Sequence, residues 1–100
     1  MSVVVIAKFQ GDTAVFRRAL TERADEFVKI SESARAAGEL HHRFGIGDGF
    51  VLTVQEWESP AHYEQFFADP ALQSFIASVG GAPAPPEITF AEAITSPDQF

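Results

Sequence analysis

Cysteine is absent and positive charge is scarce in this 100-residue sequence. Without cysteine the chain forms no disulfide and has no thiol chemistry, which is compatible with the cytoplasmic location that we expect. Lys and Arg number 7 against 14 Asp and Glu, so the formal net charge is −7. Nucleic acids and anionic membranes both require a basic protein face, and we therefore expect neither as a partner.

Long apolar runs and metal-binding spacings are also missing. No apolar stretch approaches the roughly 20 residues of a membrane span, and the short apolar N-terminus lacks the basic lead and the cleavage site of a signal peptide. Three histidines without ligand spacing predict no metal site. Gly45, Gly47 and Gly49 belong to a hairpin, not to a strand-to-helix turn, so no dinucleotide is expected. The sequence thus predicts no cofactor.

The chain does contain the apolar residues needed for one core, at 46% of its length. This suffices for a single domain spanning residues 1–100. The β-branched run from Val3 to Phe9 predicts a strand buried on both faces. Apolar residues then recur every three or four positions from Phe16 to Ala34, which predicts one amphipathic helix of about 22–24 residues that Gly38 ends.

The second half predicts a hairpin, a helical leg and a last strand. Residues 39–46 and 50–57 flank a Gly-Asp-Gly turn of three residues. Ser59-Pro60 and Asp69-Pro70 each place a capping residue before a proline, so two helical segments follow. Residues 88–94 alternate and form the last strand. The order β-α-β-β-α-β defines an α+β, ferredoxin-like fold with a four-stranded antiparallel sheet whose helices share one face.

The central hairpin decides which polar side chains share a face of the sheet. If Ile46 pairs with Phe50, then Arg43 lies opposite Thr53 and His41 lies opposite Gln55, on the same face as Trp57. Slippage of the hairpin by one residue would exchange the faces, so the parity stays open. An exposed apolar sheet face would cost several kcal/mol at about 25 cal/mol per Å². We therefore expect a homodimer formed through the sheet.

Three segments resemble a known family. They are Thr53-Val54-Gln55-Glu56-Trp57, Glu58-Ser59-Pro60-Ala61-His62-Tyr63 and Phe66-Phe67-Ala68-Asp69-Pro70. A strand that ends on tryptophan and a capped helix after it resemble the dimeric α/β-barrel superfamily, and within it the antibiotic-biosynthesis-monooxygenase-like group. The resemblance covers nearly the whole chain and implies a pocket between the sheet and the helices.

The resemblance also implies residue roles. In quinone-forming members a strand tryptophan and a tyrosine in the next helix line the pocket, and Trp57 and Tyr63 match them. An asparagine stands four residues before that tryptophan in the family, whereas this chain has Thr53, which cannot reproduce the paired donor and acceptor of an amide. Phe66 and Phe67 would line the pocket if it is open. Both Trp57 and Tyr63 have an alternative interpretation as ordinary packing residues.

The polar residues suggest a base. His41, beside Arg43 and Gln55, is a candidate general base near neutral pH, although this face could simply be open to solvent. His42 lies between apolar neighbours and is interpreted as a buried histidine with satisfied hydrogen bonds, and His62 as a surface residue.

Together these features suggest a small-molecule-binding homodimer, and specifically a cofactor-independent monooxygenase acting on an aromatic or polyketide-like substrate. Trp57 would donate a hydrogen bond, Tyr63 would orient the substrate, and Thr53 would be a weak polar contact. Two alternatives remain open. One is a non-catalytic ligand-binding or assembly module of the same fold, and the other is a lactone or enol isomerase.

Overall fold

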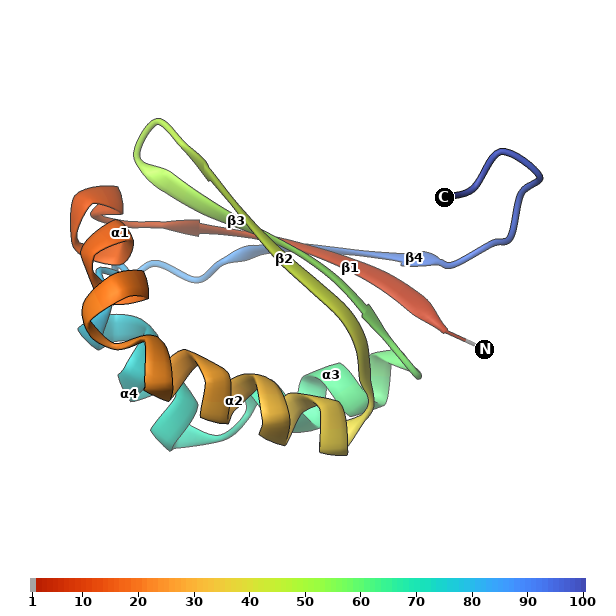
Figure 1. Cartoon of the computed structure of the whole chain (residues 1–100), viewed down its shortest axis with the longest axis horizontal. Coiled ribbons are helices and arrows are strands. Elements are labelled where there is room, and N and C mark those ends of the chain that lie inside the picture. The colour runs from red at the N-terminus through yellow and green to blue at the C-terminus, as the bar shows by residue number, and fades with distance from the viewer. Residues whose placement is uncertain (1) are drawn as a thin grey trace.

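Four strands form one antiparallel sheet in the computed structural model, which describes residues 2–100. They are β1 (Val3–Gln10), β2 (Glu39–Gly47), β3 (Phe50–Trp57) and β4 (Glu87–Glu92), arranged in the order β2-β3-β1-β4. The helices cover one face of this sheet (Figure 1). The predicted α+β, ferredoxin-like fold is confirmed.

Each of the two helical legs is divided into two helices. The first leg contains α1 (Thr13–Glu22) and α2 (Ala24–Ala37), and the second contains α3 (Pro60–Phe67) and α4 (Pro70–Ser78). Ser59 and Asp69 act as caps, as predicted, because their side chains accept backbone N–H groups at the starts of α3 and α4, and Asp12 does the same for α1. Gly38 ends α2 with φ of 118°. None of the helices in residues 2–100 has the length and hydropathy needed to cross a bilayer.

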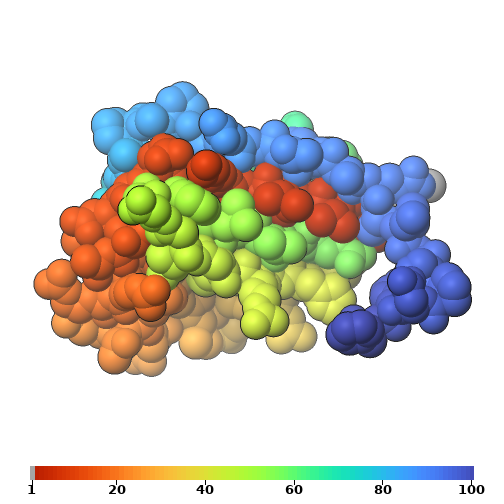
Figure 2. Space-filling model, turned by 90° about the horizontal axis from the view of Figure 1, so that it is seen from above, coloured from red at the N-terminus to blue at the C-terminus, as the bar shows by residue number. Residues whose placement is uncertain are grey.

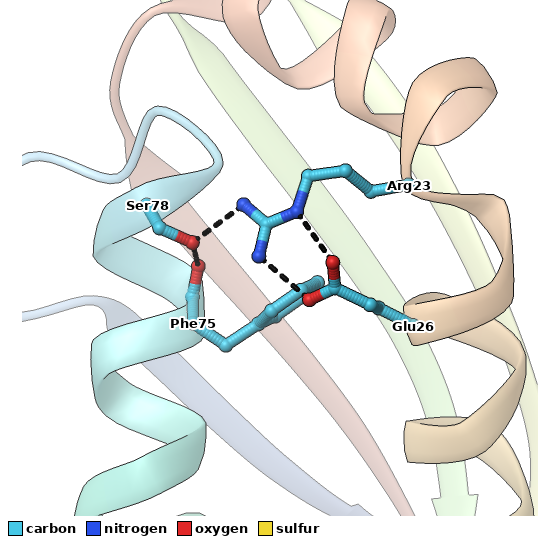
Figure 3. A network of polar contacts seen from close by, with 4 residues as sticks. All are labelled: Arg23, Glu26, Phe75 and Ser78. Atoms are coloured by element: carbon cyan, nitrogen blue, oxygen red, sulfur yellow. Dashed lines mark hydrogen bonds and ion pairs between the residues drawn. The ribbon is translucent and has the colours of Figure 1, made fainter.

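The prediction of one continuous first helix is wrong, because the helix breaks at Arg23. This residue has φ of −121° and ψ of 31° between the two helical segments. Its guanidinium pairs with Glu26 at 2.6 Å, donates to Oγ of Ser78 at 2.8 Å and lies 4.8 Å from the ring centroid of Phe75 (Figure 3). These contacts with α4 join the two helical legs, which the apolar periodicity of one leg alone does not reveal.

The hairpin between β2 and β3 is shifted by one residue from the predicted pairing. Gly47 pairs with Phe50, so the turn has two residues, Asp48 and Gly49, where three were predicted. Gly49 supplies the positive φ, 77°, that this tighter turn requires. As a result Phe44 lies opposite Thr53.

A β-bulge near the start of β2 changes the parity of the strand. Glu39 pairs with Trp57, but the register shifts between Glu39 and His41, and the extra residue, Leu40, is 48% exposed. Beyond the bulge His42 lies opposite Gln55. Because side chains alternate along a strand, the bulge allows Glu39 and His42, three residues apart, to face the helices together.

The buried residues form two clusters at different ends of the sheet. The first is centred on Trp57 and Tyr63, and the second on Phe16 and Val51. The remaining buried members are Val3, Val5 and Ala34 in the first cluster, and Ala19 and Val79 in the second.

The other face of the sheet carries no helix and is apolar at its centre. Figure 2 looks onto this face, where the strands are uncovered. Ile6 and Val54 are direct cross-strand partners there and are 40% and 41% exposed. The prediction that β1 is buried on both faces is therefore wrong for a single copy of the chain. The last strand also ends earlier than predicted, leaving Ile94 78% exposed in the C-terminal tail.

The connection after α4 depends on a glycine whose replacement tests this packing. Gly80 has φ of +105°, and a Cβ there would lie 2.6 Å from the carbonyl oxygen of Asp12. Gly49 also has positive φ, but a Cβ there would meet nothing within 4 Å. We expect Gly49→Ala to lower the free energy of unfolding by about 1–2 kcal/mol and Gly80→Ala to lower it further, because the backbone must also shift. Urea denaturation with matched m-values measures both changes, and equal losses would contradict this account.

Candidate active site

A cavity of about 290 Å³ lies between the sheet and the helices, where the two buried clusters meet. Its walls are mainly phenylalanine and aliphatic side chains. Phe16 packs edge-to-face against Phe44 at 5.0 Å between ring centroids, and Phe27 packs similarly against Phe75 at 5.1 Å. A dry cavity of ~150 Å³ can bind benzene, so this one has room for a fused aromatic of two or three rings.

The sheet contributes a polar strip to this apolar cavity. Thr53 and Gln55 project from β3, and Glu39 and His42 project from β2. Adjacent pairing of the two strands places His42 opposite Gln55. A few convergent polar groups on one wall of an apolar cavity fix the orientation of a bound ligand. We call these four residues the polar strip.

Thr53 carries an unsatisfied hydroxyl. The residue is 5% exposed, and its Oγ1 is the one buried side-chain nitrogen or oxygen without a hydrogen-bond partner in residues 2–100. A buried polar atom left unpaired costs about 1–3 kcal/mol. A ligand oxygen in the cavity would satisfy this hydroxyl, which can both donate and accept.

Gln55 is held in place by the only tryptophan. Nε1 of Trp57 donates to Oε1 of Gln55 at 2.7 Å, and both residues are buried. This hydrogen bond uses the Gln55 oxygen, so the amide N–H groups of this cavity-lining residue are not needed for the contact with Trp57. Trp57 itself is 0% exposed and lies outside the cavity lining. The predicted donor therefore reaches the cavity through Gln55, not directly.

Tyr63 lies in the same buried cluster as Trp57. Its ring centroid is 4.4 Å from that of Phe67, 5.8 Å from that of Trp57 and 5.5 Å from that of Phe90. Burial raises the pKa of Tyr63 to about 12, so the phenol stays neutral at physiological pH. Tyr63 is absent from the cavity lining, whereas Phe66 and Phe67 are part of it, as the sequence predicted for the two phenylalanines.

His41 and Arg43 do not lie where the sequence placed them. The shifted register puts His41 opposite Glu56 and Arg43 opposite Val54, on the bare face of the sheet. Both are exposed. Their predicted position on the face of Trp57 is wrong, because the one-residue shift moves the side chains of β2 beyond the bulge to the other face.

Glu39 and His42 take the position that His41 was expected to occupy. Nδ1 of His42 lies 3.2 Å from Oε2 of Glu39, and the side chains are 29% and 4% exposed. The imidazole also packs edge-to-face on Phe44 at 4.5 Å between centroids. Sequence reasoning missed this pair, because residues three apart on a regular strand point to opposite faces and only the bulge brings them together.

Comparisons with known proteins show what this fold resembles. No family model matches the chain, and no curated protein sequence matches it. Several solved structures match closely in shape. ActVA-Orf6, a monooxygenase of Streptomyces coelicolor solved in complex with nanaomycin D, has a TM-score of 0.67 at 26% identity and covers 95% of this chain and 89% of its own.

Two further structures match over nearly their full lengths. SnoaB of Streptomyces nogalater, described as a cofactor-independent oxygenase, has a TM-score of 0.65 at 12% identity and covers 98% of each chain. Rv0793 of Mycobacterium tuberculosis has a TM-score of 0.62 at 20% identity, covering 98% of this chain and 100% of its own.

The chain therefore has a ferredoxin-like α+β fold, which it shares with ActVA-Orf6 and SnoaB. The resemblance to the antibiotic-biosynthesis-monooxygenase-like group, inferred from residues 53–70, is confirmed by these structures.

Titration of the only tyrosine tests the packing of the Trp57 cluster. We expect the tyrosinate absorbance of the folded protein to rise with a midpoint near pH 12, against about 10 in urea. Because the pKa is raised in the folded state, the associated stability is fully present below pH ~10 and is lost as the pH rises through the folded value. A folded-state midpoint near 10 would show that Tyr63 is open to solvent.

Proposed function

We propose that this chain binds an aromatic or polyketide-like substrate in the cavity and oxygenates it with O₂, without a bound cofactor, as a homodimer. The observation that carries the proposal is the buried, unpartnered hydroxyl of Thr53 in the wall of an apolar cavity. The apolar walls suit a flat ring system, and the polar strip supplies donors for a carbonyl or phenolate oxygen.

The reaction requires little from the protein beyond binding and polarisation. A substrate such as anthrone loses a proton from its CH₂ group, and the resulting carbanion, delocalised as an enolate, supplies electrons to O₂. One O₂ is consumed, the CH₂ becomes C=O, and one water leaves. Hydrogen bonds that stabilise the enolate oxygen, in a cavity that excludes water, favour the first step.

Thr53 stands where quinone-forming relatives have asparagine, and Gln55 supplies an amide nearby. Gln55 lies on the same face of β3 two residues further on, with its oxygen held by Trp57. This pairing supports an arrangement in which Gln55 donates to the substrate oxygen and Thr53 makes a second contact. Trp57 would orient Gln55, while Phe66 and Phe67 would pack against the substrate rings.

The proposed dimer rests on the bare face of the sheet. Its centre is formed by Val4, Ile6, Leu52 and Val54, with Lys8 stacked on Phe50 at 4.4 Å from the ring centroid. Burial of such a patch against a second copy removes apolar surface from water at about 25 cal/mol per Å². A twofold axis would let the same patch meet itself.

Substitution of Thr53 tests the function and has a stability readout as well. Thr53→Val keeps the shape but removes the hydroxyl, so we expect the ligand-free protein to gain about 1–3 kcal/mol of unfolding free energy. Anthrone affinity, measured by Trp57 fluorescence, should fall about 3–10-fold for one lost neutral hydrogen bond. Oxygen uptake with anthrone should fall as well.

Thr53→Ser, which keeps the hydroxyl, is the matched control and should retain affinity and oxygen uptake. Unchanged binding and turnover in Thr53→Val would contradict the role of the hydroxyl. Failure of the wild-type protein to consume oxygen with anthrone or related quinols, despite binding them, would indicate a binding protein instead of an oxygenase.

The dimer is tested on the same bare face. We expect Val54→Asp to convert the protein to a monomer in sedimentation velocity at micromolar concentration, because it would bury an unpaired carboxylate at the centre of the interface. Ala61→Asp places the same charge on an exposed position of α3 and should leave the dimer intact. A wild-type protein that sediments as a monomer would refute the proposed interface.

A further inference from the structure

The Glu39–His42 pair is the one histidine–carboxylate contact in the cavity wall among the described residues. A second pair, His62 with Glu58 at 3.5 Å, lies outside the lining, and its side chains are 44% and 57% exposed. The two pairs therefore share their chemistry but differ in environment. Only the first has a carboxylate almost fully removed from water.

The geometry assigns an orientation to the imidazole. With Nδ1 held 3.2 Å from the Glu39 carboxylate, the hydrogen bond favours a proton on Nδ1 and leaves Nε2 as the acceptor. In residues 2–100 no other side chain is hydrogen-bonded to this ring. Packing on Phe44 at 4.5 Å restrains the ring plane. A carboxylate that holds one imidazole nitrogen prepares the other to take a proton.

Besides the pair, the one charged residue in the described cavity lining is Asp12, whose carboxylate accepts the backbone N–H groups of Ala14 and Val15 at the start of α1. The residue opposite His42 on β3 is the neutral Gln55. On α2, Glu32 and Arg35 border a shallow groove at the outer edge of β2 that Glu39 also touches. Glu56 and Arg43 project from the other face of the sheet.

We infer that His42, positioned by Glu39, is the general base that removes the proton from the substrate. This inference rests on the proposed function. Nε2 of His42 takes the proton of an activated C–H group, and the electron pair stays on the substrate as an enolate whose oxygen lies near Gln55 and Thr53. The enolate then reduces O₂, the C–O bond forms, and the proton on His42 passes to the resulting peroxide before water leaves.

The bulge at Leu40 supports this assignment by an independent route. Bulges are common beside active sites, where they re-aim a side chain. Here the bulge brings Glu39 and His42 to one face. The imidazole is then a partner for a buried carboxylate whose burial would otherwise be costly. Glu39 is thus a positioning residue, and His42 is the residue that touches the substrate.

Proton removal can be measured without oxygenation. Anthrone is incubated with the protein in D₂O under argon, and exchange of its CH₂ protons is followed by NMR against the protein-free rate. We expect His42→Asn to lose at least about 100-fold of the protein-dependent exchange, as for a general base. Its anthrone dissociation constant should change by less than about threefold, since only the transition state is affected. Glu39→Gln should show a smaller loss.

Two histidine variants sharpen the comparison. His62→Asn removes the exposed acid-paired histidine and should exchange as the wild type does. His41→Asn tests the histidine that a regular strand without the bulge would place on the cavity face. The inference would be overturned if His41→Asn lost proton exchange and His42→Asn kept it. If His42→Asn consumes oxygen and exchanges anthrone protons as the wild type does, His42 is not the general base, while the proposed oxygenase function stands. If the wild type exchanges these protons and His42→Asn does not, but no oxygen is consumed, the role of His42 stands and the proposed oxygenase function is rejected.

A measurement on the ligand-free protein tests the Glu39–His42 hydrogen bond directly. Long-range ¹⁵N correlation spectra report which imidazole nitrogen carries the proton. We expect the Nδ1–H tautomer at His42 in the wild type and its loss in Glu39→Leu, with His41 as the unperturbed internal reference. An Nε2–H tautomer at His42 in the wild type would overturn the inference, whether or not anthrone binds.

Discussion

The pairing of β2 with β3 determines which side chains reach the cavity. The two-residue turn at Asp48 and Gly49 sets one parity, and the bulge at Leu40 resets it for Glu39. A one-residue change in this register would turn His42 to the other face, away from Thr53 and Gln55, because strand side chains alternate. The cavity chemistry, the bare apolar face and the exposed positions of His41 and Arg43 all follow from this one pairing.

The two-cluster core explains why a cavity of this size exists in so small a protein. Trp57 and Tyr63 fill one end of the space under the sheet, and Phe16 and Val51 fill the other. The break at Arg23 and its contacts with Ser78 and Phe75 tie the two helical legs together where the second cluster lies. The helices are therefore held around the cavity at its ends, and its middle is left for a ligand.

The polar strip costs stability that a purely apolar wall would not. Thr53 has an unpaired hydroxyl, and Glu39 is a carboxylate with 4% exposure. Proteins tolerate such groups where function requires them, because ligand binding repays the missing hydrogen bonds. The Trp57–Gln55 hydrogen bond, by contrast, is satisfied and holds the side chain of a residue that lines the cavity.

Local signals in the sequence determined the elements and the fold class. Ser59 and Asp69 marked helix starts, Gly38 marked a helix end, and Phe66 and Phe67 line the cavity as expected. Caps, prolines and apolar periods act over a few residues, so they can be read from the chain directly. Tertiary structure alone decided the hairpin register, the bulge, the helix break at Arg23 and hence the Glu39–His42 contact. These depend on which of several nearly equivalent pairings packs best against distant segments, and no local pattern encodes that choice.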